Sequence, residues 1–308
     1  MKKTENYFES SNGENTVKYY VYEPDDADIK AVIQFVHGMA EHIERYEEFF
    51  EYLTGEGFAV YGDNHIGHKD SVKSDDDLGY FAHEDGWKCL VKDEHRLTQI
   101  IRKDYPDHRI FIYGHSMGSF ITRAYISKFS DDVAGAVISG SAGKNPALGA
   151  GKKLTALIRK IKGERYRSPL ITAIMFGSYN KRYKNVKTAY DWLTRDESVV
   201  AAYEADKYCG FMFTTSGYMD LMNVLEYVTD NSWYEKVPKK LPMFFIAGEM
   251  DPVGNWGAAY VEIDEKFKKL SMADVTVRLY PEMRHEVHNE IGKEKVWRDV
   301  TSWINDRL

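Results

Sequence analysis

The sequence predicts an α/β protein whose mostly parallel, doubly wound sheet is interrupted by an inserted helical segment. Short apolar runs alternate with helical patterns along most of the chain, and this is the rhythm of strand–helix–strand units. The alternation stops after Ser139 and resumes near Leu241. The 308 residues, 43% apolar and 29% charged, suffice for one large domain or two modest ones.

The expected elements before Ser139 follow from the spacing of apolar residues. Residues 17–22 alternate as a half-buried strand does, whereas residues 31–36 are almost continuously apolar, as in a strand buried on both faces. Further strands are expected at 58–61, 109–113 and 133–138, and helices at 45–53, 86–105 and 116–129.

Residues 140–237 show helical patterns without a convincing buried strand. After them we expect strands at 241–247 and 275–280, and helices at 258–270 and 287–308. Because long structureless loops are rare in compact domains, the insertion is expected to fold as a cap over the carboxyl edge of the sheet. The expected organisation is a core from 1–139 and 238–308 with a helical cap or lid at 140–237.

Composition excludes several classes of protein. The net charge of −7 argues against a nucleic-acid partner, which would require a basic excess. No apolar run is long enough to span a bilayer, and the first residues lack the apolar stretch of a secretory signal. Cys89 and Cys209 alone provide neither a disulfide framework nor a four-ligand zinc site. We expect a cytoplasmic protein with no bound metal.

The pentapeptide 114–118 has the form G-x-S-x-G, directly after an expected strand and before an expected helix. A nucleophile elbow needs this context, because glycines on both sides permit the tight turn that exposes the serine hydroxyl. Ser116 is therefore the candidate nucleophile. The alternative is an ordinary turn in which Ser116 caps the helix.

A nucleophilic serine requires a base, and the base requires an orienting acid. Asp251 follows the expected strand 241–247 and is the favoured acid, with Glu249 as its rival. His285 follows the expected strand 275–280 and is the favoured base over His288, which we expect one turn into the last helix. An oxyanion hole would use the backbone N–H groups of Met117 and, in the loop after strand 31–36, Met39, although that loop could be a plain turn.

These segments resemble the α/β-hydrolase superfamily, and within it the monoacylglycerol lipase and bacterial lysophospholipase family of serine aminopeptidase-like hydrolases. Residues 37–46 resemble its HGxxEHxxRY segment, and 114–119, 251–254 and 284–290 resemble its elbow, acid loop and histidine loop. The resemblance implies an α/β-hydrolase fold, a Ser116–His285–Asp251 triad and no cofactor. Residues 64–71 depart from the family's D-H-R-G-H-G-x-S, which puts the hydrogen bonding of that loop in doubt.

Two parts of the insertion bear on the substrate. Residues 152–167 form a basic amphipathic pattern, which would either contact an anionic lipid surface or head group, or pack on the core with a solvated outer face. Flexible apolar residues further along would either line an acyl channel or pack within the cap. These residues are Phe211, Met212, Phe213, Tyr218 and Met219.

The sequence thus predicts a serine carboxylic-ester hydrolase that acts on a lipid-like monoacyl ester, a monoacylglycerol or lysophospholipid, through an acyl-enzyme. A transient contact with a membrane or micelle surface is compatible with this prediction, and no obligate protein partner is expected. Two alternatives stay open: a peptidase of the proline-iminopeptidase kind, and a non-catalytic binding protein that retains the fold.

Overall fold

An eight-stranded sheet forms the centre of the molecule in the computed structural model, which describes residues 1–25 and 28–308. The strand order is β1-β2-β4-β3-β5-β6-β7-β8; β1–β2 and β2–β4 pair antiparallel, and all other pairs are parallel. The strands are β1 Lys2–Glu9, β2 Thr16–Glu23, β3 Ala31–Val36, β4 Phe58–Asn64, β5 Ile110–His115, β6 Gly135–Ser139, β7 Met243–Gly248 and β8 Val275–Tyr280. The predicted mostly parallel, doubly wound sheet is confirmed.

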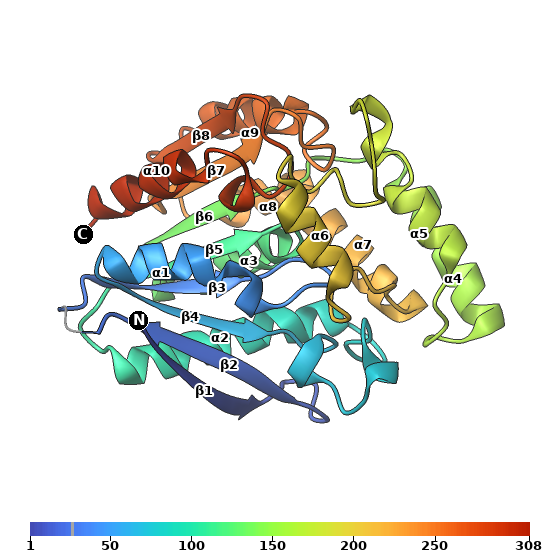
Figure 1. The fold of residues 1–308 in the computed structure, drawn as a ribbon, viewed down its shortest axis with the longest axis horizontal. Coiled ribbons are helices and arrows are strands. Elements are labelled where there is room, and N and C mark those ends of the chain that lie inside the picture. The colour runs from blue at the N-terminus through green and yellow to red at the C-terminus, as the bar shows by residue number, and fades with distance from the viewer. Residues whose placement is uncertain (26–27) are drawn as a thin grey trace.

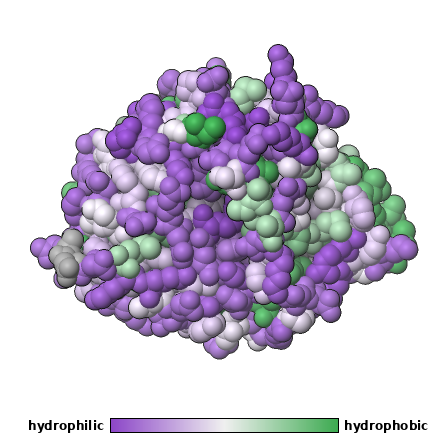
Figure 2. All heavy atoms as spheres, viewed as in Figure 1, coloured by the Kyte–Doolittle hydropathy of each residue, from purple (hydrophilic) through white to green (hydrophobic). Residues whose placement is uncertain are grey.

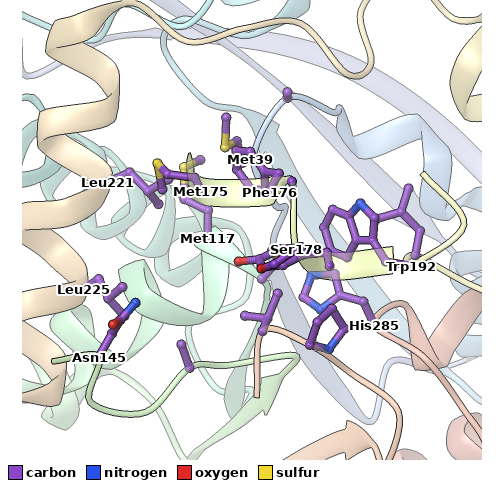
Figure 3. A pocket seen from close by; sticks show the side chains of 18 of the residues that line it. Met39, Met117, Asn145, Met175, Phe176, Ser178, Trp192, Leu221, Leu225 and His285 are labelled. Atoms are coloured by element: carbon purple, nitrogen blue, oxygen red, sulfur yellow. The ribbon is translucent and has the colours of Figure 1, made fainter. Parts of the chain in front are cut away.

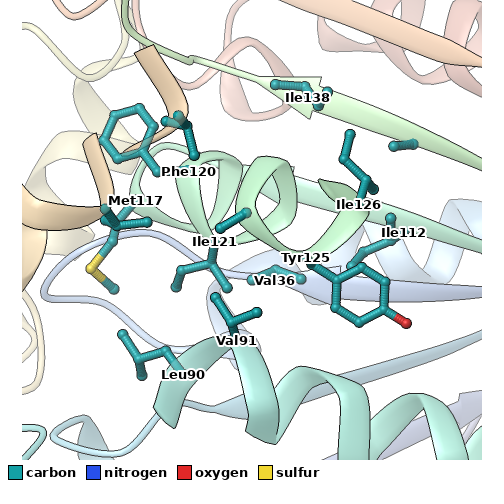
Figure 4. Close-up of a cluster of buried hydrophobic side chains, with 14 of the residues drawn as sticks. Val36, Leu90, Val91, Ile112, Met117, Phe120, Ile121, Tyr125, Ile126 and Ile138 are labelled. Carbon is teal, nitrogen blue, oxygen red and sulfur yellow. The ribbon is translucent and has the colours of Figure 1, made fainter. Parts of the chain in front are cut away.

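Helices cover both faces of this sheet (Figure 1). Helices α1 (Glu47–Gly55) and α10 (Lys293–Asn305) pack on one face, where alternate strand residues such as Ile33 and Phe35 form one buried cluster. Helices α2 (Gly86–Asp104), α3 (Met117–Phe129) and α9 (Ala258–Lys269) pack on the other. Figure 4 shows this second cluster, with Val36 and Ile112 of the sheet facing Ile121 of α3 and Val91 of α2.

The inserted segment between β6 and β7 is helical. Its helices are α4 Leu148–Lys162, α5 Pro169–Phe176, α6 Glu197–Ala205, α7 Thr215–Thr229 and α8 Asn231–Lys236. Helices α4 to α7 lie beyond the end of the sheet toward which the parallel strands point (Figure 1). Short 3₁₀ helices occur at Ile43–Tyr46, Lys69–Ser71, Asp75–Asp77, Ser130–Asp132, Tyr179–Arg182 and Val287–Asn289. Among the described residues, no helix has both the length and the apolar character needed to cross a bilayer.

Helices α4 and α5 leave part of their apolar surface exposed. The side chains of Leu157 and Ile161 on α4, and of Leu170 and Ile174 on α5, are more than half exposed. Figure 2 shows hydrophobic residues gathered over these two helices, at the right of the view. The amphipathic stripe of residues 152–167 therefore does not simply pack on the core, since two of its apolar members face outward.

Candidate active site

The predicted elbow is a sharp strand-to-helix turn. Ser116 joins β5 to α3 with φ 53° and ψ −120°, a conformation that residues with a side chain rarely adopt. A Cβ on Gly118 would collide with the carbonyl oxygens of Val36 and His37, and one on Gly114 would collide with the turn itself. The turn is thus possible only with glycine at both positions, and it leaves the serine at the wall of a cavity.

The favoured acid and base lie side by side at the carboxyl edge of the sheet. His285 Nδ1 is 2.9 Å from Asp251 Oδ2, and both side chains are at most 1% exposed. The other oxygen, Oδ1, accepts the backbone N–H of Val253 at 2.8 Å. The rivals are not placed for this role: Glu249 is exposed, and His288, expected at the surface, is fully buried among aromatic rings.

His285 presents its second nitrogen without a competing partner. Nε2 is buried and has no hydrogen-bond partner, and both His285 and Ser116 line the same cavity. Burial opposes protonation of the ring, but the Asp251 carboxylate outweighs it and raises the pKa of His285. No hydrogen bond to Ser116 Oγ is formed in the described structure, and catalytic hydrogen bonds often tighten only when substrate binds.

Met39 and Met117, whose N–H groups are the candidate oxyanion donors, both line the cavity from two separate backbone segments. Met117 is the first residue of α3, where a backbone N–H has no acceptor within the helix. On both sides of Met39 the N–H groups are already used: that of Gly38 donates to Glu41 Oε1, and that of Ala40 to His68 Nε2 at 3.2 Å. The loop after β3 is therefore a braced structure rather than a plain turn.

The segment that departs from the family pattern still braces this loop. Asn64 Oδ1 accepts the N–H of Ile43 at 2.9 Å, and His65 Nε2 lies 3.1 Å from the carbonyl oxygen of His37. His68 supplies the acceptor for Ala40. The substitutions in residues 64–71 have therefore not removed the hydrogen bonds that hold the loop after β3.

A buried ion network that sequence reasoning missed connects this loop to the histidine loop. Arg45 donates two hydrogen bonds of 2.9 Å to the carboxylate of Glu286 and also pairs with Glu41. Burial opposes ionisation of the Glu286 carboxyl, but the neighbouring Arg45 guanidinium outweighs burial and lowers the pKa of Glu286 to about 2. The sequence held only a partial signal, the i, i+4 spacing of Glu41 and Arg45, and nothing in it marked Glu286 as their partner.

A cavity of about 900 Å³ opens beside Ser116 and His285. Figure 3 shows its labelled side chains: Met39, Met117, Met175 and Phe176 lie together, and Ser178 and Trp192 lie near His285. Among the residues predicted to contact substrate, Phe211, Met212 and Tyr218 line the cavity.

Two of the residues predicted to contact substrate do not line this cavity. Phe213 is fully buried and packs against the rings of His68, Phe81 and Tyr218. Met219 contributes to a separate shallow pocket beside α4. Met219 lies outside the cavity because adjacent positions on a helix such as α7 point about 100° apart, and its neighbour Tyr218 faces the cavity.

Within the described part of the chain, two clusters of side chains have the composition of a metal site. His42, Asp206 and Cys209 form one, and Asp63, His65 and Glu94 form the other, with the potential ligand atoms of each within 4.8 Å of one another. Neither cluster includes Ser116, His285 or Asp251.

The sheet topology, the elbow serine and the histidine–aspartate pair define an enzyme of the α/β-hydrolase fold. The model of the family "serine aminopeptidase, S33" matches residues 27–292, and the chain belongs to this family. It is therefore a serine hydrolase.

Relatives span nearly the whole chain. A monoacylglycerol lipase of Mycolicibacterium smegmatis is 27% identical over 294 residues, which cover 95% of this chain and 94% of the relative. A monoglyceride lipase of Mus musculus is 25% identical, over 91% of this chain and 84% of the relative. The crystal structure of a thermostable carboxyl esterase from Bacillus coagulans, in complex with glycerol, superposes with a TM-score of 0.92 at 28% identity, covering 100% and 99% of the two chains.

Proposed function

We propose that this enzyme hydrolyses the ester of a lipid-like monoacyl substrate, a monoacylglycerol or a lysophospholipid. The observation that carries the proposal is the cavity of about 900 Å³ that joins Ser116 and His285 to an apolar wall. That wall contains Met117, Phe120, Met175, Phe176, Phe211, Met212, Leu221 and Leu225. Methionine and phenylalanine side chains adapt to an alkyl chain, and the lipases among the relatives agree with such a substrate.

The positions of three side chains support the following course for the reaction. His285 takes the proton of Ser116 through Nε2, and the serine oxygen attacks the ester carbonyl to form an acyl-enzyme. The N–H groups of Met39 and Met117 stabilise the negative charge on the carbonyl oxygen. His285 returns the proton to the leaving alcohol and then activates water for deacylation. Asp251 fixes the ring through Nδ1 and stabilises the imidazolium.

Residues 140–237 serve as a cap over this site, on a core formed by 1–139 and 238–308. The exposed apolar side chains of α4 and α5 fit a transient contact with a membrane or micelle surface, where such substrates reside. The basic residues nearby divide into two groups. Arg159 and Arg165 are paired with Glu164 and Asp77, whereas Lys153 is exposed and available to anionic head groups.

A peptidase specific for a free amino terminus would need an uncompensated acidic group in the cavity. The acidic residues that line it are each paired: Glu41 and Glu286 with Arg45, and Glu262 with Lys266. This pairing favours the esterase. Parallel assays with amino-acyl amides and acyl esters of matched size separate the two activities.

The test is hydrolysis of monoacylglycerols, lysophospholipids and short p-nitrophenyl esters over a series of chain lengths, with a fluorophosphonate probe for the nucleophile. We expect Ser116→Ala to abolish both turnover and labelling. Ser127→Ala, on the same helix but outside the cavity, is the matched control and should keep both. Labelling without turnover of any long-chain ester would refute the lipid substrate; wild-type protein that neither labels nor turns over would refute catalysis.

A further inference from the structure

The segment that departs from the family pattern contains a group of buried charges that the hydrolase reaction does not use. Asp63 lies in β4, His65 directly follows it, and Glu94 projects from α2, with all three side chains at most 1% exposed. His65 Nδ1 lies 3.2 Å from Asp63 Oδ1 and 3.4 Å from Glu94 Oε1. Three potential ligands from two elements thus converge at a point without access to water.

The hydrogen bonds around the ring determine which nitrogen carries a proton. His65 Nε2 lies 3.1 Å from the carbonyl oxygen of His37, which can only accept, so Nε2 is the protonated nitrogen. In a neutral ring, Nδ1 then presents a lone pair toward the two carboxylate oxygens. Neither of those oxygens has a hydrogen-bond partner. Three lone pairs that face one another in a dry interior are strongly unfavourable unless something positive lies between them.

A proton is the simplest occupant, and its fit is poor. Burial, together with the Asp63 carboxylate, raises the pKa of Glu94, so this carboxyl favours its protonated form. Yet neither contact of His65 Nδ1 has the geometry of a hydrogen bond, although both distances are short enough. A proton on Glu94 Oε1 would have to be donated to Asp63 or His65, yet neither Glu94 Oε1 nor Asp63 Oδ1 has a hydrogen-bond partner among the described residues.

A divalent ion fits the same distances. Ligands placed about 2.0–2.1 Å from a tetrahedral zinc ion lie roughly 3.3–3.4 Å apart. The two separations from His65 Nδ1, 3.2 and 3.4 Å, are close to this value, and all three ligand atoms lie within 4.8 Å of one another. Two carboxylates and one neutral imidazole balance the charge of the ion. A metal ligand histidine characteristically donates its other N–H to a carbonyl, as His65 does to His37.

The outer contacts hold the third ligand as well. Gln34 Nε2 donates to Glu94 Oε2 at 2.6 Å, and Thr98 in turn donates to Gln34 Oε1 at 2.7 Å. These bonds leave Glu94 Oε1 as the free oxygen that faces His65. Such supporting bonds orient ligands in known metal sites.

We propose that Asp63, His65 and Glu94 bind a divalent ion of the zinc class beneath the loop that follows β3. The sequence led us to expect no metal, because its two cysteines suggested none and because this cluster involves residues 31 positions apart. The site is structural: the ion fixes His65, and His65 holds the carbonyl of His37, one residue before the glycine of the candidate oxyanion loop. Because the site is buried, the ion enters during folding and exchanges slowly.

The experiment is metal analysis of the full chain, purified without metal-affinity chromatography and dialysed against a chelator in the folded state. We expect about one zinc-class ion per chain in the wild type, and loss of that ion in Asp63→Asn and Glu94→Gln. Asp93→Asn is the matched control, since Asp93 is a buried carboxylate on the same helix that bonds Ser10 and Ser11 instead. It should keep the ion.

Refolding of the wild-type chain keeps the test decisive even if the variants do not fold. Refolding with Co²⁺ should give a visible spectrum of nitrogen and oxygen ligation, and a thiolate charge-transfer band would instead place the ion at Cys209 and overturn the proposal. Less than about a tenth of an ion per chain, both as isolated and after refolding with Zn²⁺, Mn²⁺ or Co²⁺, would show that the cluster shares a proton instead.

Discussion

Replacement of Arg45 by methionine tests the buried ion network most directly. The change removes the guanidinium, which pairs with Glu286 and Glu41 and lies 4.6 Å from the ring centroid of Tyr203, but it keeps most of the apolar stem. The side chains of all three charged residues are at most 9% exposed, so the remaining carboxylates would be left almost without water.

The size of the effect follows from this burial. Removing one partner of a buried pair costs about 3–5 kcal/mol, because the remaining charge stays uncompensated. At about 2.1 cal/mol/K of unfolding entropy per residue, a chain of 308 residues loses about 1.5 °C of melting temperature per kcal/mol, so the melting temperature should fall by roughly 5–8 °C. Lys187→Met, which breaks an exposed pair with Glu197, is the control and should cost less than about 1 kcal/mol.

The pH dependence separates lost charge pairing from lost packing. In the wild type the pKa of Glu286 is lowered to about 2, below its usual value of about 4.3, so its contribution to stability is complete above that value and declines as pH falls toward 2. Burial already raises the pKa of Glu41 in the wild type, although Arg45 opposes it. In Arg45→Met this opposition is lost, so burial raises the pKa of both Glu286 and Glu41, and the folded state binds protons more readily than the unfolded state. The variant's deficit should therefore shrink as pH falls from 8 to 5.

Thermal unfolding followed by near-ultraviolet circular dichroism at both pH values measures this. A decrease in the free energy of unfolding of Arg45→Met below about 1 kcal/mol, or a decrease that is equal at pH 5 and pH 8, would refute the reasoning.

Three further predictions concern the catalytic edge and the outer helices. Asp251→Asn should lower kcat/KM by about four orders of magnitude. It should also shift the acid limb of the pH–rate profile to lower pH, because burial then lowers the pKa of His285 without an opposing carboxylate. An acid limb at the wild-type pH would contradict this prediction. Gly118→Ala should abolish labelling by a fluorophosphonate because its Cβ collides with backbone oxygens, whereas Gly149→Ala, in open space on α4, should be neutral or stabilise by about 0.5–1 kcal/mol. Ile161 on α4 is 67% exposed, and Ile161→Glu should reduce binding to anionic vesicles, measured by sedimentation, at least tenfold (roughly 1.5 kcal/mol). Turnover of a soluble short ester should not change. Vesicle binding equal to that of the wild type would exclude α4 from the contact.

The fold was predictable where local pattern and tertiary environment agree. The central strands β3, β5 and β7 are buried on both faces, and their apolar runs were found within two residues of the observed ends. β1 was missed for the opposite reason. It is an edge strand whose side chains are nearly all exposed, so its sequence KKTENYFE carries no apolar alternation.

The candidate site was predictable to the extent that topology determines it. Carboxyl ends of parallel strands meet at one edge of the sheet, so a serine after β5, an aspartate after β7 and a histidine after β8 must lie close to one another. Which apolar residues of the insertion line the cavity was not predictable, since Tyr218 and Met219 differ only in the direction in which α7 presents them. Nor does a buried ion pair between residues as distant as Arg45 and Glu286 leave a periodic signature.

The loop after β3 is one of the places at which core and insertion are hydrogen-bonded, and this has a mechanical consequence. Its carbonyl at Ala40 accepts the N–H of Gly210 at 2.9 Å and the hydroxyl of Tyr203 at 3.0 Å, both from the inserted segment. On the other side, the N–H of Ala40 donates to His68 of the core. Any opening of the insertion that carries residues 203–210 away must therefore break these bonds or pull on the residue next to Met39. Access to the cavity and the geometry of the candidate oxyanion hole are consequently coupled through a single peptide segment.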